Sequence, residues 1–186
     1  MKTQPVLIGA ALLALFAAPV SAAPFSAIYA FGDSLSDAGN AYIASGGTTP
    51  RAPPHALVNG FGVFSNGPVW VQDLAGELGL GALLPSLAGG TDFAVGGAQT
   101  GGFGAYAGSP GDLLPAPGNP TPASQLGMFL ADVPTPAPNA LYTLAIGGND
   151  LFTIFTLDAG NPTQAAADAT AVLVQCLATV LTCTTK

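Results

Sequence analysis

The stretch Ser26-Ala27-Ile28-Tyr29-Ala30-Phe31-Gly32-Asp33-Ser34-Leu35-Ser36-Asp37 joins a short apolar run to a small polar turn. Apolar, β-branched and aromatic residues dominate its first half, which predicts a buried strand over 26–31. Gly32 and Asp33 then break the strand and leave Ser34 at its carboxyl end. Open α/β sheets bind ligands at that end of their strands, so Ser34 is a candidate nucleophile. The same residues also fit an ordinary strand-to-helix loop that contains a helix N-cap.

Two further apolar runs end in turns of a similar kind. The segment 91–95 leads into Gly96-Gly97, and the segment 140–146, predicted to be the clearest buried strand, leads into Gly147-Gly148-Asn149-Asp150. Predicted helices alternate with these strands, which favours an α/β fold with a largely parallel sheet. All three carboxyl ends should then meet at one edge of the sheet.

The first of the predicted helices begins at Pro68, because the fixed φ of proline suits a first helical turn, with residue 66 or 67 as the cap. Trp70, Leu74 and Leu78 recur every four residues and share one helix face, so core packing is the default role of Trp70. A modest helix is predicted to start at Ser124.

The last helix is predicted over 161–180. Asn161 is its expected cap, Pro162 lies in its first turn, and Gln164 stands at the capping-box position.

Ester hydrolysis by a serine needs an activated hydroxyl, a base that takes its proton, and donors aimed at the oxyanion of the tetrahedral intermediate. Ser34 supplies the hydroxyl. Gly97 offers a backbone N–H that no Cβ obstructs, and Asn149 offers an uncharged side-chain donor. The predicted catalytic residues are therefore Ser34, Gly97 and Asn149.

Three segments carry a family resemblance. FGDSLSD (31–37), DFAVGGA (92–98) and IGGND (146–150) resemble, in order and approximate spacing, the first three blocks of the GDSL lipases and esterases, the SGNH hydrolases. FSNGPVWV (64–71) is similar to a stretch of the secreted, phospholipase-like branch. The resemblance covers residues 26–152.

The resemblance implies a flavodoxin-like, three-layer α/β/α sandwich with a mainly parallel sheet. It also implies hydrolysis of carboxylic esters, lipid esters included, with no metal or organic cofactor. By position, Ser34 matches the family nucleophile, whose own backbone N–H helps to hold the oxyanion. Gly97 and Asn149 match the other two oxyanion donors of the family.

The chain departs from the family pattern in three places. Asp92 stands where the second block usually opens with Asn, and Val63 stands where a charged residue is often seen. The final Asp-x-x-His block has no counterpart, since no histidine follows Asn149. We therefore expect an N-terminal portion of the domain, with a fold incomplete at its C-terminus and without the catalytic Asp and His.

A serine nucleophile needs a base near neutral pH, and histidine is the usual one. The one histidine of the chain, His55, lies in a Pro-rich loop with no aspartate placed to orient it. It is either a substitute base or a solvated loop residue. The loops 41–66 and 101–123 are expected to shape the substrate pocket.

Composition narrows the possible partners. The 186 residues, 49% of them hydrophobic, suit one domain with a sizeable core. Only 3 Lys+Arg stand against 10 Asp+Glu, so a nucleic-acid partner is excluded. The glycine-rich turn lacks the spacing of a nucleotide-binding loop, and 2 Cys with 1 His do not predict a metal site. We expect a small-molecule or lipid ester substrate.

The first residues have the pattern of a secretory signal. Lys2 precedes an apolar run over 6–18, and small residues follow up to Ala23. We predict a signal peptide over 1–23 and a hydrolase domain over 24–186, in the periplasm or outside the cell. An uncleaved anchor is the alternative, but the run is shorter than the roughly 20 residues that a spanning helix needs.

Export would permit a disulfide between the two cysteines, Cys176 and Cys183. On an uninterrupted helix they would lie about 10.5 Å apart, beyond the roughly 7 Å limit between bridged Cα atoms. A disulfide therefore requires the helix to end around 179–182. Two free thiols are the alternative.

Two functions fit the sequence. The first is a secreted carboxylester hydrolase of the GDSL type. The second is a catalytically inactive, extracytoplasmic binding module that keeps the fold without the base. If the sheet lacks its last strand and helix, an uncovered apolar face and strand edge would favour aggregation or a partner.

Overall fold

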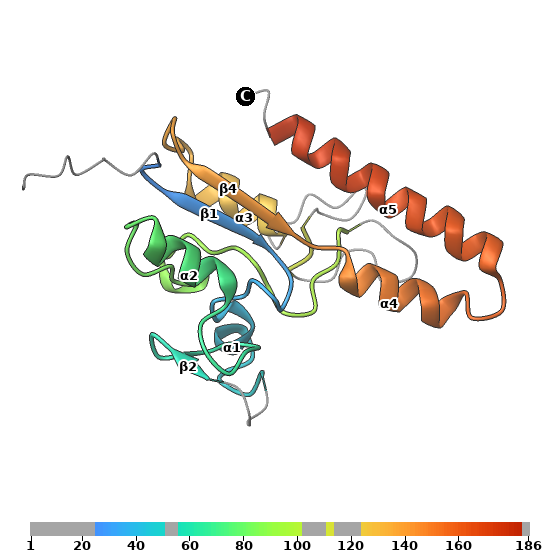
Figure 1. The fold of residues 1–186 in the computed structure, drawn as a ribbon, viewed down its shortest axis with the longest axis horizontal. Helices are drawn as coiled ribbons and strands as arrows, with labels where there is room; N and C mark the ends of the chain where they lie inside the picture. Colours follow the sequence, from blue (N-terminus) through green and yellow to red (C-terminus); the bar gives the residue numbers. More distant parts are fainter. Residues whose placement is uncertain (1–24, 51–55, 102–110, 114–123, 184–186) are drawn as a thin grey trace, which may run out of the picture.

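The computed structural model describes residues 25–50, 56–101, 111–113 and 124–183, with side chains up to residue 174. Figure 1 shows the elements, which follow in chain order as β1 (Ile28–Gly32), α1 (Asn40–Ala44), β2 (Leu57–Val58), β3 (Phe61–Gly62), α2 (Trp70–Glu77), the 3-10 turn η1 (Ser86–Ala88), α3 (Gln125–Asp132), β4 (Leu141–Ala145), α4 (Gly148–Leu157) and α5 (Pro162–Cys183). The predicted signal peptide lies outside the described residues.

The central sheet is parallel, as predicted. β1 pairs with β4 in a register that runs from Ile28 opposite Leu141 to Gly32 opposite Ala145. On the other side of β1 an extended segment continues the sheet: the N–H of Phe93 donates to the carbonyl of Ala30 at 2.7 Å. The three strand-like segments expected from the sequence therefore lie side by side.

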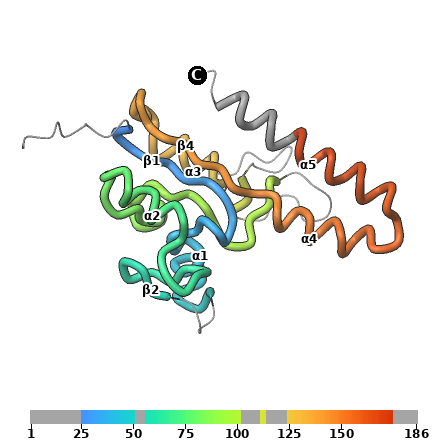
Figure 2. The backbone as a smooth tube through the Cα atoms, viewed as in Figure 1, coloured from blue at the N-terminus to red at the C-terminus, as the bar shows by residue number. Residues whose placement is uncertain are grey.

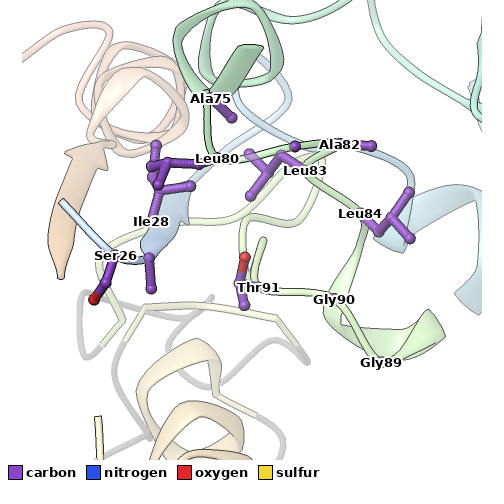
Figure 3. Close-up of a pocket in the computed structure, with 12 residues that line it drawn as sticks. Ser26, Ile28, Ala75, Leu80, Ala82, Leu83, Leu84, Gly89, Gly90 and Thr91 are labelled. Carbon is purple, nitrogen blue, oxygen red and sulfur yellow. The ribbon is translucent and has the colours of Figure 1, made fainter. Parts of the chain in front are cut away.

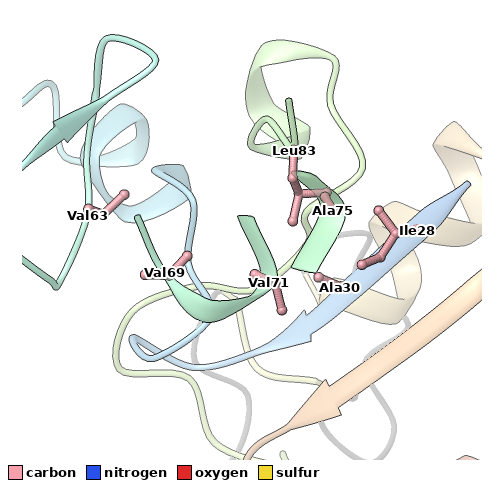
Figure 4. Packing of buried hydrophobic residues seen from close by; sticks show 7 residues of the cluster. All are labelled: Ile28, Ala30, Val63, Val69, Val71, Ala75 and Leu83. Carbon is pink, nitrogen blue, oxygen red and sulfur yellow. The ribbon is translucent and has the colours of Figure 1, made fainter. Parts of the chain in front are cut away.

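Helices cover both faces of this sheet. On one face, side chains of β1 pack against α2 and the segment that follows it, in a cluster drawn in Figure 4 that consists of Ile28, Ala30, Val63, Val69, Val71, Ala75 and Leu83. On the other face, the Phe129 ring of α3 lies 5.1 Å from the Tyr29 ring and 5.4 Å from the Phe31 ring, centroid to centroid. Helix, sheet and helix form the three layers of an α/β/α sandwich.

The start of α2 differs from the prediction. The helix begins at Trp70, not at Pro68, and its cap is Val69, whose N–H donates to Oε1 of Gln72 at 3.1 Å. The apolar face is also shifted by one residue: Val71 is fully buried whereas Trp70 is 44% exposed. The predicted core role of Trp70 is therefore wrong, because α2 turns its Val71 side toward β1.

The other two predicted helix starts are confirmed. Oγ of Ser124 accepts a hydrogen bond from the N–H of Gly127 at 3.0 Å. Oδ1 of Asn161 accepts one from the N–H of Gln164 at 3.1 Å. α5 then continues to Cys183 without the interruption that a disulfide would require; the cysteine side chains lie outside the described ones.

β4 is less buried than predicted. Tyr142 and Leu144 are 47% and 37% exposed, whereas Thr143 is buried. Among the described strands β4 pairs with β1 alone, so its outer edge and one face receive little cover. The structure also adds elements that the sequence did not predict: α1 begins just before the expected loop 41–66 and extends into it, the β2–β3 hairpin lies within that loop, and α4 follows β4. None of the helices in the described part of the chain has the length and apolarity of a membrane span.

Candidate active site

The turn after β1 is held by Asp33. Its carbonyl accepts the N–H groups of Ser36 and Asp37 at 3.0 and 3.1 Å, and its Oδ1 accepts the N–H of Leu35 at 3.0 Å. Asp33 is buried, while Ser34 is partly exposed. The structure thus places Ser34 in a tight turn at the carboxyl end of β1, and no described residue hydrogen-bonds its hydroxyl.

Glycine is needed at position 32 because the chain passes close to β4 there. A Cβ on Gly32 would lie 2.5 Å from the carbonyl oxygen of Ala145 and 3.0 Å from Oγ of Ser36. Any larger residue would push the Ser34 turn away from the end of β4.

The turn that carries Gly97 is closed by a hydrogen bond from the N–H of Ala98 to the carbonyl of Val95 at 3.0 Å. Gly97, the third residue of this turn, has φ +83°, a value that L side chains rarely adopt. Gly97 is exposed, and within the described residues its N–H has no acceptor. This N–H is therefore available to a ligand.

Asn149 lies in the first turn of α4. Its Nδ2 donates to the carbonyl of Ala98 at 2.9 Å, which places the amide beside the Gly97 turn. The preceding residue, Gly148, is close to the Ser34 turn, because a Cβ there would lie 3.6 Å from Oδ2 of Asp33. The structure therefore brings the three predicted segments together at one edge of the sheet.

A buried polar network supports the Asn149 side of this edge. Nε2 of Gln99 donates to the carbonyl of Asn149 at 3.2 Å and also contacts Oγ1 of Thr153. The carboxylate of Asp150 accepts the hydroxyl of Thr100 at 2.6 Å and its N–H at 3.1 Å. The start of α4 is thus tied at two consecutive residues to the segment after Gly97.

Two buried carboxylates join the Ser34 turn to the Gly97 turn. Oδ2 of Asp37 accepts the N–H of Gly96 at 2.7 Å. Oδ2 of Asp92 accepts the N–H of Ala38 at 2.6 Å. No local sequence pattern predicts a role for either residue, although Asp92 departs from the asparagine that usually opens the second block.

Burial is the largest cause of the raised pKa of both carboxyl groups. Loss of hydration raises the pKa of Asp37, and the four backbone N–H groups that it accepts oppose that rise. Burial raises the pKa of Asp92 well above its usual value; the bond from Ala38 opposes this, and the nearby Asp37 charge adds to it.

Trp70 contacts the Ser34 turn from α2. Its indole Nε1 donates to Oγ of Ser36 at 3.1 Å, and Ser36 is fully buried. The exposed part of the indole, together with Leu35 at 68% exposure, presents apolar surface near Ser34.

A cavity of about 330 Å³ lies at the opposite, amino end of β1. Figure 3 shows its wall, to which Ser26, Ile28, Leu80, Leu83 and Thr91 contribute. None of the predicted catalytic residues lines it. The described residues hold no group of three or more His, Cys, Asp or Glu side chains that could bind a metal, and His55 lies outside them.

At the carboxyl ends of the strands, the backbone passes from the end of β4 to the start of α4 (Figure 2).

A segment of 70 residues is 47% identical to the phosphatidylcholine-sterol acyltransferase of Aeromonas hydrophila, and the match covers 36% of this chain and 20% of that protein. The family model for GDSL-like lipase/acylhydrolase matches residues 28–181. The SGNH hydrolase fold of that family agrees with the three layers described above. Because the match spans most of the sequence, the chain belongs to the GDSL-like lipase/acylhydrolase family, whose enzymes act on ester bonds.

Proposed function

We propose that this protein is an extracytoplasmic serine hydrolase of carboxylic esters, with Ser34 as the nucleophile. The N–H groups of Gly97 and Ser34 and the side-chain amide of Asn149 are the oxyanion donors. The observation that carries the proposal is the 2.9 Å bond from Nδ2 of Asn149 to the carbonyl of Ala98. It supports the proposal because the Asn149 amide then lies beside the Gly97 turn, at the edge of the sheet where the Ser34 turn follows β1.

In the proposed reaction, Oγ of Ser34 attacks the ester carbonyl carbon, and the serine proton passes to a base. The negative charge that develops on the carbonyl oxygen is held by the donors from Gly97 and Asn149. The alcohol then leaves with a proton, and water hydrolyses the acyl-serine. No step in this scheme requires a metal or an organic cofactor.

The base is the open part of the mechanism, because the described residues include no histidine. His55 is the candidate within the chain. If Ser34 lacks an efficient base in this chain, added imidazole should accept the serine proton and raise the rate that depends on Ser34.

The test is hydrolysis of p-nitrophenyl butyrate with and without imidazole. Ser34→Ala should abolish the protein-dependent rate, and Asn149→Ala should lower kcat by roughly 100-fold or more, as expected for the loss of one oxyanion donor. Ser65→Ala is the control, since Ser65 is another partly exposed loop serine. Equal rates for the wild type and Ser34→Ala would refute the assignment.

The relative from Aeromonas suggests a narrower substrate. Its name describes acyl transfer from phosphatidylcholine to a sterol. The same acyl-serine could pass its acyl group to water or to an alcohol, so phosphatidylcholine is the acyl donor to test first, with and without a sterol in the vesicle.

The alternative is an inactive binding module that keeps the fold. It predicts that the protein binds an ester or lipid but that no rate, with or without imidazole, depends on Ser34. The low content of charged residues, 7%, is compatible with such a role.

A further inference from the structure

Two aspartates make reciprocal bonds between the Ser34 turn and the Gly97 turn. Asp37, which follows Ser34, reaches across to the N–H of Gly96 at 2.7 Å. Asp92, which precedes the Gly97 turn, reaches back to the N–H of Ala38 at 2.6 Å. We call these two contacts the aspartate bridge. Each of the two segments thus donates a backbone N–H to an aspartate side chain of the other.

The Asp37 carboxylate is held rigidly. Besides Gly96, it accepts the N–H groups of Gly39, Asn40 and Ala41 at 2.7, 2.5 and 3.0 Å, at the start of α1. A carboxylate with four short N–H donors has little freedom to move. The position of Gly96 is therefore set by α1 and, through it, by the Ser34 turn.

The side chain of Asn40 also hydrogen-bonds the segment that leads into the Gly97 turn. Its Nδ2 donates to the carbonyls of Asp92 and Ala94 at 2.8 and 2.9 Å. Its Oδ1 accepts from the N–H of Leu87 at 3.0 Å and from Oγ of Ser86 at 3.2 Å. This amide fixes the segment before Gly97, and its hydrogen bonds to described residues go to Asp92, Ala94, Ser86 and Leu87. Two described side chains hydrogen-bond the neighbours of Gly97: Asp37 bonds Gly96, and Asn149 bonds Ala98.

We propose that Asp37 is a positioning residue that holds the N–H of Gly97 at the correct place relative to Ser34, and that Asp92 makes the reciprocal half of this bridge. The inference rests on the proposed function, because Gly97 is taken as an oxyanion donor. Asp37 does not touch the reacting atoms. It acts by fixing Gly96, so that the next N–H along the chain points to the developing oxyanion.

The consequence is a specific kinetic signature. The tetrahedral intermediate needs the Gly97 N–H at hydrogen-bond distance, whereas binding of the ester does not. Displacement of a catalytic donor by about 1 Å can cost about 100-fold in rate. Loss of the Asp37 bond should therefore lower kcat by about 10- to 100-fold and leave KM within about twofold.

The experiment compares the full chain with Asp37→Asn in two measurements. The first is kcat and KM for p-nitrophenyl butyrate in the presence of imidazole. The second is amide hydrogen exchange of Gly96 by NMR. The amide group of asparagine cannot accept all four N–H donors, so we expect faster exchange at Gly96 and a lower kcat. Asp73→Asn, on the exposed surface of α2, should change neither.

Four outcomes separate the two proposals. Faster exchange at Gly96 without a fall in kcat, or a fall in kcat matched by an equal rise in KM, would overturn the inference and leave the proposed function standing. Unchanged exchange at Gly96 would also overturn it. If Ser34→Ala retains the wild-type rate, the proposed function fails, and exchange at Gly96 still decides whether Asp37 holds the turn.

Asp92→Ala is the second variant, in case Asp37→Asn does not fold. It removes the acceptor of the Ala38 and Ala94 N–H groups and leaves the bond from Asp37 to Gly96 in place. We expect a fall in kcat of the same sign but smaller, again with KM little changed. A folded Asp92→Ala protein with wild-type kcat would contradict the role of Asp92 in the aspartate bridge.

Discussion

Gln125 hydrogen-bonds both backbone polar groups of Gly32. Its Oε1 accepts the N–H of Gly32 at 2.9 Å, and its Nε2 donates to the carbonyl of Gly32 at 2.7 Å. The same Nε2 donates to the carbonyl of Gly111 at 2.7 Å. A side chain from α3 thus adds to the hydrogen bonding of the last residue of β1, immediately before the Ser34 turn, where the N–H of Val95 also donates to the Gly32 carbonyl at 3.1 Å.

Gln125→Ala should therefore destabilise the protein by about 2–4 kcal/mol, because it leaves buried backbone groups without a partner. Urea unfolding followed by circular dichroism measures this change. Gln164→Ala is the control: Gln164 is exposed on α5, and its loss should cost less than about 0.5 kcal/mol. Equal losses in the two variants would contradict the role given to Gln125.

Gly97→Ala separates conformational strain from catalysis. Gly97 and Gly79 have φ of +83° and +70°, and an added Cβ meets nothing within 4 Å at either position. Alanine should cost about 1–2 kcal/mol of stability at each, since both require a left-handed backbone. Only Gly97→Ala should also lower esterase activity, because only that strain moves a proposed oxyanion donor. Similar activities in the two variants would argue against Gly97 as a donor.

The contact between Trp70 and Ser36 should be measurable as a coupling energy. Oγ of Ser36 is buried and takes its bond from the indole N–H. Trp70→Phe and Ser36→Ala should each destabilise the protein, and the double variant should lose less than the sum by about 1 kcal/mol. Strict additivity would show that the 3.1 Å bond contributes nothing to stability.

The edge of the sheet that carries the proposed catalytic residues was largely predictable from the sequence, whereas the hydrogen bonds that support it were not. Ser34, Gly97 and Asn149 follow apolar runs, and parallel strands bring their carboxyl ends together. The bonds made by Gln125 and Asp37 join segments far apart in the chain, and no local pattern encodes such pairs. These hydrogen bonds can form only after the fold has brought the segments side by side.

The errors in the helix predictions have local causes. Pro68 fits a first helical turn, but Gln72 bonds back to the N–H of Val69 and moves the start of α2 to Trp70. That shift turns Trp70 to the surface. α1 was missed because its five residues are too few to show a helical period, and it depends on capping by the Asp37 carboxylate. The catalytic base and the signal peptide stay predictions.

The two buried carboxyls should make stability depend on pH with a defined sign. The folded-state pKa values of Asp37 and Asp92 are raised above 3.8. The folded protein therefore binds more protons than the unfolded chain above that pH, and the free energy of unfolding falls as pH rises through the raised values.

Asp92→Asn removes one of these groups and should flatten that decline. Each proton difference contributes a slope of about 1.4 kcal/mol per pH unit. Urea unfolding at a series of pH values from 4 to 7 measures the slope in the wild type, in Asp92→Asn and in the exposed control Asp73→Asn. The prediction fails if the Asp92→Asn profile runs parallel to the wild type.

α4 carries the two most exposed aromatic side chains of the described residues. Phe152 and Phe155 are 72% and 68% exposed and lie one turn apart, and the neighbouring Leu151 is 42% exposed. Exposed apolar groups gathered in this way favour association with other molecules. Replacement of both phenylalanines by serine should lower the binding of the dye ANS and reduce aggregation. Because neither ring contributes to the core clusters, the free energy of unfolding measured in urea should stay within about 0.5 kcal/mol of the wild-type value. A large loss of stability would instead show that these rings pack against the rest of the protein in solution.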